Sequence, residues 1–336
     1  MLRRMAPDPV DIWAMADLVK PFAVRTVATL RVADIVRDRP VALEEIAKRS
    51  EAQADPLGRL LRYLVQHGMF TEPEPDVFGP NAASRELESD SPSGTREWLD
   101  LDGAVGRADL AFVELIEQVR GHHPAYRAAF GRSFWEDLAH SAQLSDSFDD
   151  LMETKSSTLA PVVADELDWD RFGRVADIGG GKGVLIDAIL QRYPDVRGMV
   201  VDLAGPARNA DEYLRSRGLR DRVEVVTGSF FDPLPDSADA YVLSDVLGDW
   251  DDEDAIRILA RCAEAAGADG SVLIIELLPG APEAFTEMDL RMMIYVGGRM
   301  RDLDRTDRIA SAAGLFVAAV TRVSGGYGII ECLPDR

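Results

Sequence analysis

The chain has 336 residues, of which 46% are hydrophobic and 29% charged, a composition typical of a folded globular protein and too apolar for a disordered one. Its 37 basic and 59 acidic residues give a net charge of −22. This charge argues against nucleic acid or an anionic membrane as a partner, because both require a positive surface. Two cysteines and four histidines are too few for a disulfide framework and form no zinc-binding motif.

The N-terminus reads MLRRMAPDPVDIW, with two arginines but no apolar stretch behind them, so we expect no secretory signal. No run of 18 apolar residues occurs along the chain, so we expect no transmembrane helix. The length predicts about two domains. We therefore expect a soluble, cytoplasmic protein that binds neither a membrane nor nucleic acid.

Residues 11–85 have the element order of a winged helix-turn-helix. Apolar positions recur at helical spacing over 11–40, and Pro21 is expected to divide them into two helices. A short helix over 41–50 follows, then a helix over 55–70 with Asp55 as N-cap and Gly68 as its end, and an extended pair. Nine basic residues balance nine acidic ones between Val24 and Arg85. A module without net positive charge binds DNA weakly, so we expect a structural or dimerising role.

Residues 92–165 are expected to be helical throughout, with a loop at the start of the segment 121–138. This stretch contains an aromatic cluster: Trp98, Phe112, Tyr126, Phe130, Phe134, Trp135 and Phe148. Aromatic residues at helical spacing usually form core. They also line ligand pockets near domain junctions, and the sequence leaves both interpretations open here.

From Phe172 onward, short β-rich runs alternate with helical runs. The expected strands are 174–178, 197–203, 222–228, 238–247 and 271–278, and the expected helices are 184–193, 206–218, 252–266, 288–296 and 305–314. Two further extended runs close the chain as an antiparallel pair. This alternation predicts an α/β domain with a doubly wound, mostly parallel sheet.

The glycine-rich turn V-A-D-I-G-G-G-K-G-V (175–184) joins the first of these strands to a helix. Gly179, Gly181 and Gly183 allow a tight turn and close approach to a ligand. Asp202 ends the second strand, where a carboxylate can accept hydrogen bonds from a ribose. The early third glycine and Asp177 before the turn favour an amino-acid tail over a pyrophosphate, so we expect S-adenosylmethionine. The alternative is a glycine-rich turn without a ligand.

Four stretches carry a resemblance: D-I-G-G-G-K-G within this turn, G-S-F-F-D-P-L-P (228–235), Y-V-L-S-D-V-L-G-D-W-D-D-E-D-A-I-R-I-L (241–259) and M-D-L-R-M-M-I-Y-V-G-G-R-M-R (288–301). They resemble bacterial O-methyltransferases of the caffeate type, and most of all the naphthoate O-methyltransferases of enediyne antibiotic pathways. The resemblance implies a Rossmann-like, seven-stranded methyltransferase domain with an α-helical winged-helix N-terminal dimerisation domain. It divides the chain into 1–95 (dimerisation), 96–165 (helical linker contributing to the acceptor pocket) and 166–336 (cofactor binding).

The resemblance also implies a homodimer in which helix 11–20 closes the partner's pocket, and roles for individual residues. The cofactor, with S-adenosylhomocysteine as its product, would contact Ser156, Asp177, Gly179, Gly181, Gly183, Asp202, Phe230, Phe231, Asp232, Ser244 and Trp250. A small-molecule acceptor would contact Trp13, Phe134, Trp135, Phe148, Met152, Met292, Met293 and Tyr295. Ser229 replaces an aspartate that is usual in the family.

The sequence departs from the family at both members of its acid–base pair. The family's histidine base corresponds to Gly248, and its orienting glutamate corresponds to Met300. Asp245 and Asp249 are the candidate catalytic replacements. His122 and His123, beside the aromatic cluster, are an alternative.

Two reactions are compatible with this departure. Proximity alone can supply an effective molarity of about 10⁵–10⁸ M, and a general base increases the rate by about a further 10²–10⁴-fold. Methyl transfer can therefore proceed without the histidine if the acceptor is already nucleophilic. An aromatic or polyketide-type natural-product intermediate is the expected acceptor. The alternative is a related enzyme that keeps the bound cofactor but catalyses cyclisation, decarboxylation or hydroxylation.

Overall fold

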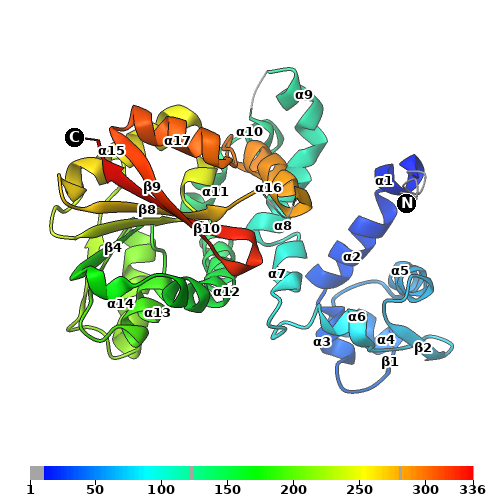
Figure 1. Ribbon diagram of the computed structural model, residues 1–336. Coiled ribbons are helices and arrows are strands. Elements are labelled where there is room, and N and C mark those ends of the chain that lie inside the picture. Colours follow the sequence, from blue (N-terminus) through cyan, green and yellow to red (C-terminus); the bar gives the residue numbers. More distant parts are fainter. Residues whose placement is uncertain (1–10, 122–123, 280–281, 336) are drawn as a thin grey trace, which may run out of the picture. The chain divides into compact units, whose positions relative to one another are not determined.

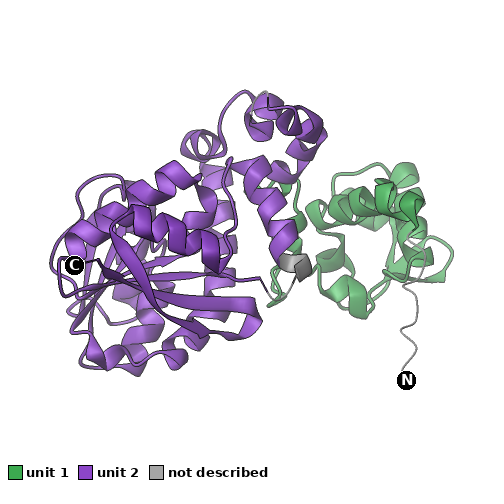
Figure 2. Ribbon diagram, turned by 45° about the horizontal axis from the view of Figure 1, so that its top comes forward, with its two compact units in different colours: residues 1–106 green, residues 107–336 purple. Residues whose placement is uncertain are grey.

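The computed structural model describes residues 11–121, 124–279 and 282–335. The chain forms two compact units, residues 1–106 and 107–336 (Figure 2). Helix α8 (Ala104–Asp109) contains the boundary between them. Among the described residues, no helix is long and apolar enough to cross a membrane.

Unit 1 is a small helical module with a three-stranded sheet. Its strands are β1 (Val41–Ala42), β2 (Thr71–Glu74) and β3 (Val77–Gly79), in the order β1-β3-β2 with antiparallel pairing. Its helices are α1 (Ile12–Ala16), α2 (Val19–Thr29), α3 (Val32–Val36), α4 (Leu43–Arg49), α5 (Ala54–Gln66), α6 (Ala82–Arg85) and α7 (Thr95–Leu99). The strands and the helices before them have the expected winged-helix order.

Two sequence predictions in unit 1 were wrong in detail. Pro21 does not break a helix, because it occupies the third position of α2, where the backbone N–H that proline lacks needs no partner. The break falls instead between α1 and α2, at Asp17 and Leu18. Gln53 is the N-cap of α5, and Asp55 lies within its first turn, where its charge favours the positive end of the helix.

The first two helices of unit 1 present apolar side chains to solvent. Six large hydrophobic residues are between 40% and 88% exposed in the single chain: Ile12, Trp13, Met15, Leu18, Val19 and Phe22. The core of the unit is built elsewhere, with Val27, Ile46, Leu61 and Phe78 completely buried. These side chains form an exposed apolar face on α1 and α2 of unit 1.

Unit 2 is built on a seven-stranded sheet with the order β6-β5-β4-β7-β8-β10-β9. Its strands are β4 (Arg174–Ile178), β5 (Arg197–Asp202), β6 (Val223–Thr227), β7 (Ala240–Ser244), β8 (Ser271–Leu277), β9 (Leu315–Arg322) and β10 (Tyr327–Pro334). The first five in chain order pair in parallel, whereas β10 pairs antiparallel with β8 and β9 (Figure 1).

The helices of unit 2 connect these strands or precede the sheet. Those before the sheet are η1 (Leu110–Glu114), α9 (Leu115–Val119), α10 (Ala125–Phe130), α11 (Phe134–His140), α12 (Ala142–Glu166) and η2 (Trp169–Arg171). Those within it are α13 (Val184–Arg192), α14 (Ala204–Ser216), η3 (Leu247–Asp249), α15 (Asp252–Ala266), α16 (Pro282–Tyr295), α17 (Leu303–Ala312) and η4 (Ser324–Gly326).

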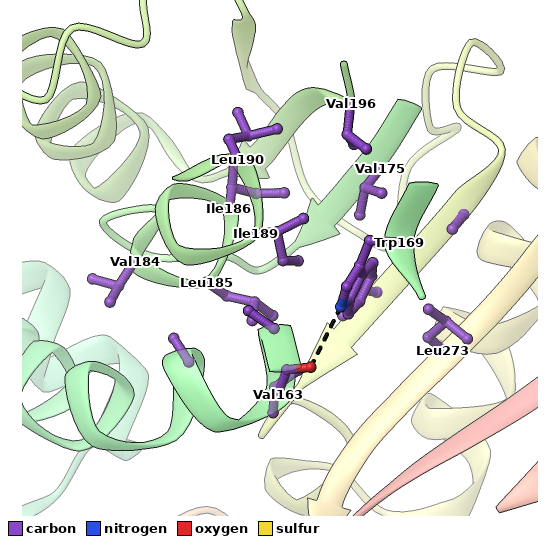
Figure 3. Packing of buried hydrophobic residues seen from close by; sticks show 14 of the residues in the cluster. Val163, Trp169, Val175, Val184, Leu185, Ile186, Ile189, Leu190, Val196 and Leu273 are labelled. Carbon is purple, nitrogen blue, oxygen red and sulfur yellow. Dashed lines mark hydrogen bonds between the residues drawn. The ribbon is translucent and has the colours of Figure 1, made fainter. Parts of the chain in front are cut away.

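Separate hydrophobic cores cover the two faces of the sheet. On one face α12, α13 and α14 pack around Trp169, whose indole N–H donates to the backbone oxygen of Val163 at 3.3 Å (Figure 3). On the other face α15 and α17 bury Ile258, Leu259 and Ile309 against the strands. Each fully buried side chain of this size contributes about 1.5–3 kcal/mol, so both layers fix the sheet that carries the site.

The strand order reverses between β4 and β7, which lie side by side at the centre of the sheet. The α-helix that follows β4, α13, packs on one face of the sheet, and the α-helix that follows β7, α15, packs on the opposite face. This reversal is where doubly wound folds bind ligands. The glycine turn follows β4 and Asp245 follows β7, so the fold brings both to one place.

Candidate functional site

The glycine turn after β4 requires glycine on conformational and steric grounds. Gly179, Gly181 and Gly183 have φ of +72°, +55° and +79°, values that other residues rarely adopt. A Cβ at Gly179 would lie 3.1 Å from Val246 Cγ2, and one at Gly183 would lie 2.9 Å from Leu214 Cδ1. Bare backbone therefore lines the start of α13, as a closely approaching ligand requires.

Asp202 holds this turn from the end of β5. Its Oδ2 accepts a hydrogen bond from Gly181 N at 2.9 Å, and its Oδ1 accepts one from Leu203 N at 2.7 Å. Burial raises the pKa of Asp202 while these two hydrogen bonds lower it. The exposed side chain of Leu203 stands beside the carboxylate. This pairs a hydrogen-bond acceptor with an apolar surface, as a nucleoside requires.

Asp177 lies deeper, at the end of β4, and is only 2% exposed. Burial and then the nearby charge of Asp202 raise the pKa of Asp177 to about 7. Two carboxyls in a low-dielectric site separate their pKa values in this way. Asp177 packs against the turn, because a Cβ at Gly180 would lie 2.6 Å from its Oδ2.

Aromatic side chains gather beyond Asp202, where the adenine contacts are expected. The Phe230 and Phe231 ring centroids are 5.1 Å apart, and the Trp250 ring lies 5.7 Å and 4.9 Å from them. Asp232 follows as an exposed residue. The structure thus brings Phe230, Phe231 and Trp250 together into one apolar cluster.

Helix α12 is tied to this edge of the sheet by side chains from the glycine turn and from α14. Lys182 in the glycine turn donates to Asp150 at 3.0 Å and to Glu153 at 2.6 Å. Asn209 on α14 donates to Asp149 at 3.1 Å. The same helix carries Met152 and Ser156, both half-buried, and so holds these two expected contact residues near the glycine turn.

The aromatic residues expected around the acceptor also meet. The Phe134 ring lies 5.1 Å from Trp135, 5.5 Å from Phe148 and 6.3 Å from Tyr295. Trp135 stacks on Trp250 at 6.4 Å and so joins this group to the aromatic residues near Asp202. The residues beside Tyr295 on α16 include Met292 and Met293, both half-buried. Five of the aromatic residues whose role the sequence left open therefore form one continuous cluster: Tyr126, Phe130, Phe134, Trp135 and Phe148.

Asp245 begins the loop after β7 and has an unusual backbone. Its φ is +53°, which ends the strand at Ser244, earlier than the expected range 238–247. Lys155 Nζ lies 3.1 Å from its Oδ2, and the Tyr327 hydroxyl donates to its Oδ1 at 3.2 Å. Both partners of this carboxylate come from other elements, α12 and β10.

Gly248 lies in the short helix η3, next to two side chains. A Cβ at this position would lie 3.2 Å from Met300 Sδ and 3.5 Å from Glu276 Oε2. Gly248 N already donates to Glu276 Oε1 at 3.2 Å. The sequence positions expected to hold the histidine and the glutamate are therefore adjacent in space, and Glu276 from β8 adjoins both.

A buried arginine fixes the loop that contains Gly248. Arg301 donates to the backbone oxygens of Leu247 at 2.6 Å and Trp250 at 2.8 Å, and its Nε donates to Asp252 at 3.0 Å. Hydrogen bonds to a charged donor are stronger than neutral ones. The loop is therefore held by side-chain contacts at both of its ends.

The O-methyltransferase domain family matches residues 112–316, and the O-methyltransferase dimerisation domain family matches residues 13–90. The chain belongs to the O-methyltransferase family. Its relatives include the 2,7-dihydroxy-5-methyl-1-naphthoate 7-O-methyltransferase of Streptomyces carzinostaticus, 47% identical over 315 residues (94% of this chain, 95% of the relative). They also include the aclacinomycin 10-hydroxylase of Streptomyces purpurascens, 41% identical over 318 residues (93% and 85%).

Solved structures agree with this assignment. An O-methyltransferase from neocarzinostatin biosynthesis, crystallised with S-adenosylmethionine and 2-hydroxy-5-methyl naphthoic acid, has a TM-score of 0.92 at 46% identity, covering 97% of this chain and 99% of that one. The expectations of an α/β methyltransferase fold with an N-terminal dimerisation domain, and of S-adenosylmethionine as the family's cofactor, are confirmed.

The residues of this O-methyltransferase fit S-adenosylmethionine on their own chemistry. The turn offers bare backbone, Asp202 offers a carboxylate, and the cluster around Trp250 offers an apolar surface. Ser244 ends β7 beside them. No group of three or more metal-ligating side chains occurs among the residues that the structure describes.

Three predicted residues stand apart from this cluster. Trp13 is 88% exposed on α1 and belongs to unit 1, whereas the other expected acceptor contacts belong to unit 2. His122 and His123 lie outside the described residues.

Sequence reasoning missed two charged residues of this region, Glu276 and Lys155. Glu276 is the one charged residue in the run S-V-L-I-I-E-L-L, and Lys155 directly precedes Ser156. A carboxyl within an apolar strand was an available signal, because such a residue is costly to bury unless it has a function or a partner. Only the fold shows that Glu276 lies beside Gly248 and that Lys155 pairs with Asp245.

Proposed function

We propose that this chain transfers a methyl group from S-adenosylmethionine to an oxygen of an aromatic or polyketide-type intermediate in antibiotic biosynthesis. The observation that carries the proposal is the glycine turn held by Asp202, in a chain that is 47% identical to a naphthoate 7-O-methyltransferase over nearly its whole length. The cofactor would supply an electrophilic methyl group on a sulfonium.

The cofactor would be held by the residues gathered at the reversal of strand order. Gly179, Gly181 and Gly183 would face its methionine part together with Ser156 and Ser244, and Asp177 would support the turn. Asp202 would accept from the ribose hydroxyls. The adenine would lie against Phe230, Phe231, Asp232 and Trp250. The three aromatic rings of this set pack together.

The acceptor would lie among the aromatic and methionine side chains of α11, α12 and α16. Phe134, Trp135, Phe148 and Tyr295 supply flat apolar surfaces that suit a fused aromatic ring. Met152, Met292 and Met293 supply adaptable ones. Holding the acceptor oxygen against the methyl carbon is the main source of rate in this proposal, because proximity contributes about 10⁵–10⁸ M in effective molarity.

Asp245 and Asp249 differ as replacements for the missing histidine. Asp245 is engaged by Lys155 and Tyr327, an arrangement that holds it as an ion-pair partner. Burial, opposed in part by Lys155, raises the pKa of Asp249 to about 7, within the range useful to a base.

We further propose a cytoplasmic homodimer formed through the N-terminal region, without nucleic acid as a partner. The dimerisation-domain match over residues 13–90 and the exposed apolar face of α1 and α2 support it. Trp13 would then reach the acceptor site of the partner subunit. In this proposal residues 1–95 dimerise, 96–165 contribute to the acceptor pocket and 166–336 bind the cofactor.

A second candidate function has one specific observation in its favour. The chain is 41% identical to an aclacinomycin 10-hydroxylase, and it has Gly248 and Met300 where the methylating family has its acid–base pair. Such an enzyme would turn over its acceptor while S-adenosylmethionine is retained. The higher identity to the naphthoate enzyme favours methyl transfer.

The test measures S-adenosylhomocysteine formation over a panel of hydroxynaphthoic acids and anthracycline-type polyketides. Methyl transfer predicts that product, together with a methylated acceptor, for at least one member of the panel. The Asp202→Asn variant serves as the control, because it should fold and lose activity at limiting cofactor. Acceptor conversion without S-adenosylhomocysteine would instead establish the second candidate.

A further inference from the structure

Glu276 is the one charged residue of strand β8 and its last but one residue. The other six residues of β8 are buried, and Glu276 alone is half-buried. An acidic side chain in such a strand disfavours folding unless it is protonated or paired. Core packing therefore does not explain why a glutamate occupies this position, and a functional role does.

The position of the carboxyl is defined by Gly248 and Met300. Oε1 accepts from Gly248 N at 3.2 Å, and Oε2 would lie 3.5 Å from a Cβ at residue 248. The same Cβ would lie 3.2 Å from Met300 Sδ. Because Gly248 has no side chain, the second carboxyl oxygen borders the space in which the family's base would stand.

The surroundings of Glu276 hold more negative than positive charge. Asp245 from the end of β7 and Asp249 from η3 both disfavour its ionisation, and Lys155 from α12 favours it. Burial is the largest cause, and together these groups raise the pKa of Glu276 well above its ordinary value. Tyr327 from β10 completes the set, and burial raises the pKa of its hydroxyl as well.

This arrangement has the properties of a proton acceptor that works near neutral pH. A base is most efficient when its pKa lies near the operating pH, and an ordinary glutamate is too acidic for that. Asp245 is held by Lys155 at 3.1 Å and by the Tyr327 hydroxyl, so it fixes the ammonium group in place. Glu276 keeps one oxygen that is not used by Gly248 N.

We propose that Glu276 is a catalytic residue of the methyl transfer, the base that takes the proton of the acceptor hydroxyl. This inference rests on the proposed function. In the step, the acceptor oxygen forms a bond to the methyl carbon and the carbon–sulfur bond breaks, its electron pair remaining on sulfur. The hydroxyl proton passes to Glu276 Oε2, and the protonated carboxyl then returns it to solvent.

The proposal explains why glycine and methionine stand at the two departing positions. A side chain at residue 248 would project between Glu276 and the acceptor, and Gly248 leaves that path open. A second glutamate at position 300 would add a charge to a site that already holds three carboxyls, whereas Met300 is apolar and 7% exposed. The two changes act together with Glu276 as one site.

The test compares Glu276→Gln, Glu276→Asp and a matched control, Glu331→Gln. Glu331 also lies on a strand of the same sheet, β10, but pairs with Arg171 and Ser271, away from Gly248. For each variant we would measure kcat and kcat/KM against pH with a phenolic acceptor, the affinity for S-adenosylhomocysteine by calorimetry, and the carboxylic-acid band in pH-difference infrared spectra.

Glu276→Gln is expected to lower kcat by about 10²–10⁴-fold with unchanged S-adenosylhomocysteine affinity and loss of one titrating carboxyl band. It should also remove the acidic limb of the pH profile, which Glu276→Asp should retain. If the wild type is active and Glu276→Gln retains a kcat within about twofold of it, this inference alone is overturned. A wild-type chain that forms no S-adenosylhomocysteine with any acceptor would overturn the proposed function, and this inference with it.

Discussion

The two halves of the site depend on different parts of the chain. On the cofactor side, the turn at Gly179–Gly183 and its contact with Asp202 are made largely by backbone atoms, and the sequence there follows the family. On the acceptor side, the arrangement around Gly248 is made by side chains from four elements. The cofactor side therefore depends on backbone conformation, and the acceptor side depends on the identity of individual side chains.

The largest expected effect comes from adding a side chain to the glycine turn. Gly179→Val places a β-branched residue at φ +72°, 3.1 Å from Val246 Cγ2, and should weaken S-adenosylhomocysteine binding by about 10²-fold or more, equivalent to about 2.7 kcal/mol. Gly218→Val is the matched control, because its φ is +74° with no atom within 4 Å. Calorimetry should find normal affinity in the control, and equal losses in both variants would mean that backbone strain alone is responsible.

Asp202→Asn should have the next largest effect. It replaces a charged acceptor of two backbone hydrogen bonds by an amide that can accept through only one oxygen. Hydrogen bonds to charged groups contribute about 1.5–3 kcal/mol, so the Kd for S-adenosylhomocysteine should rise by about 10–100-fold. Unchanged affinity in a titration would remove Asp202 from the cofactor site.

Asp177→Asn should change stability in a pH-dependent way. The folded-state pKa of Asp177 is about 7 against an ordinary 3.8, so the folded chain holds a proton that the unfolded chain loses as pH rises from about 4 to about 7. The stabilising contribution of the protonated group is complete below this window and is lost as pH rises through it. Asp177→Asn should therefore become more stable relative to the wild type as pH rises through that window, by about 1.4 kcal/mol for each pH unit, as measured by urea unfolding. A constant difference at all pH values would contradict the assignment.

The smallest expected effect concerns the two departing positions on the acceptor side. A Cβ at residue 248 would lie 3.2 Å from Met300 Sδ, so Gly248→His and Met300→Glu should not be independent. A double-mutant cycle on kcat/KM should show a coupling energy of about 1 kcal/mol, with the double variant more active than Gly248→His alone. Additive effects would show that the acceptor side no longer holds its substrate in line.

The sequence predicted the sheet more closely than it predicted the site. Strand β4 and helix α15 match their expected ranges residue for residue, because a buried parallel strand and a capped amphipathic helix have strong local patterns. Strand β7 was predicted too long, since no local pattern reveals that Asp245 adopts a φ of +53°. Glu276 was read only as part of a strand, because its meaning depends on Gly248 and Met300, which adjoin it only in the folded chain.

The most direct test of the central claim follows the methyl group itself. The purified chain would be given S-adenosylmethionine with a deuterated methyl group and one hydroxynaphthoic acid, and both products would be quantified by mass spectrometry. We expect one labelled methyl ether for each S-adenosylhomocysteine formed. An acceptor product without the label, or acceptor turnover that leaves S-adenosylmethionine intact, would contradict methyl transfer by this site.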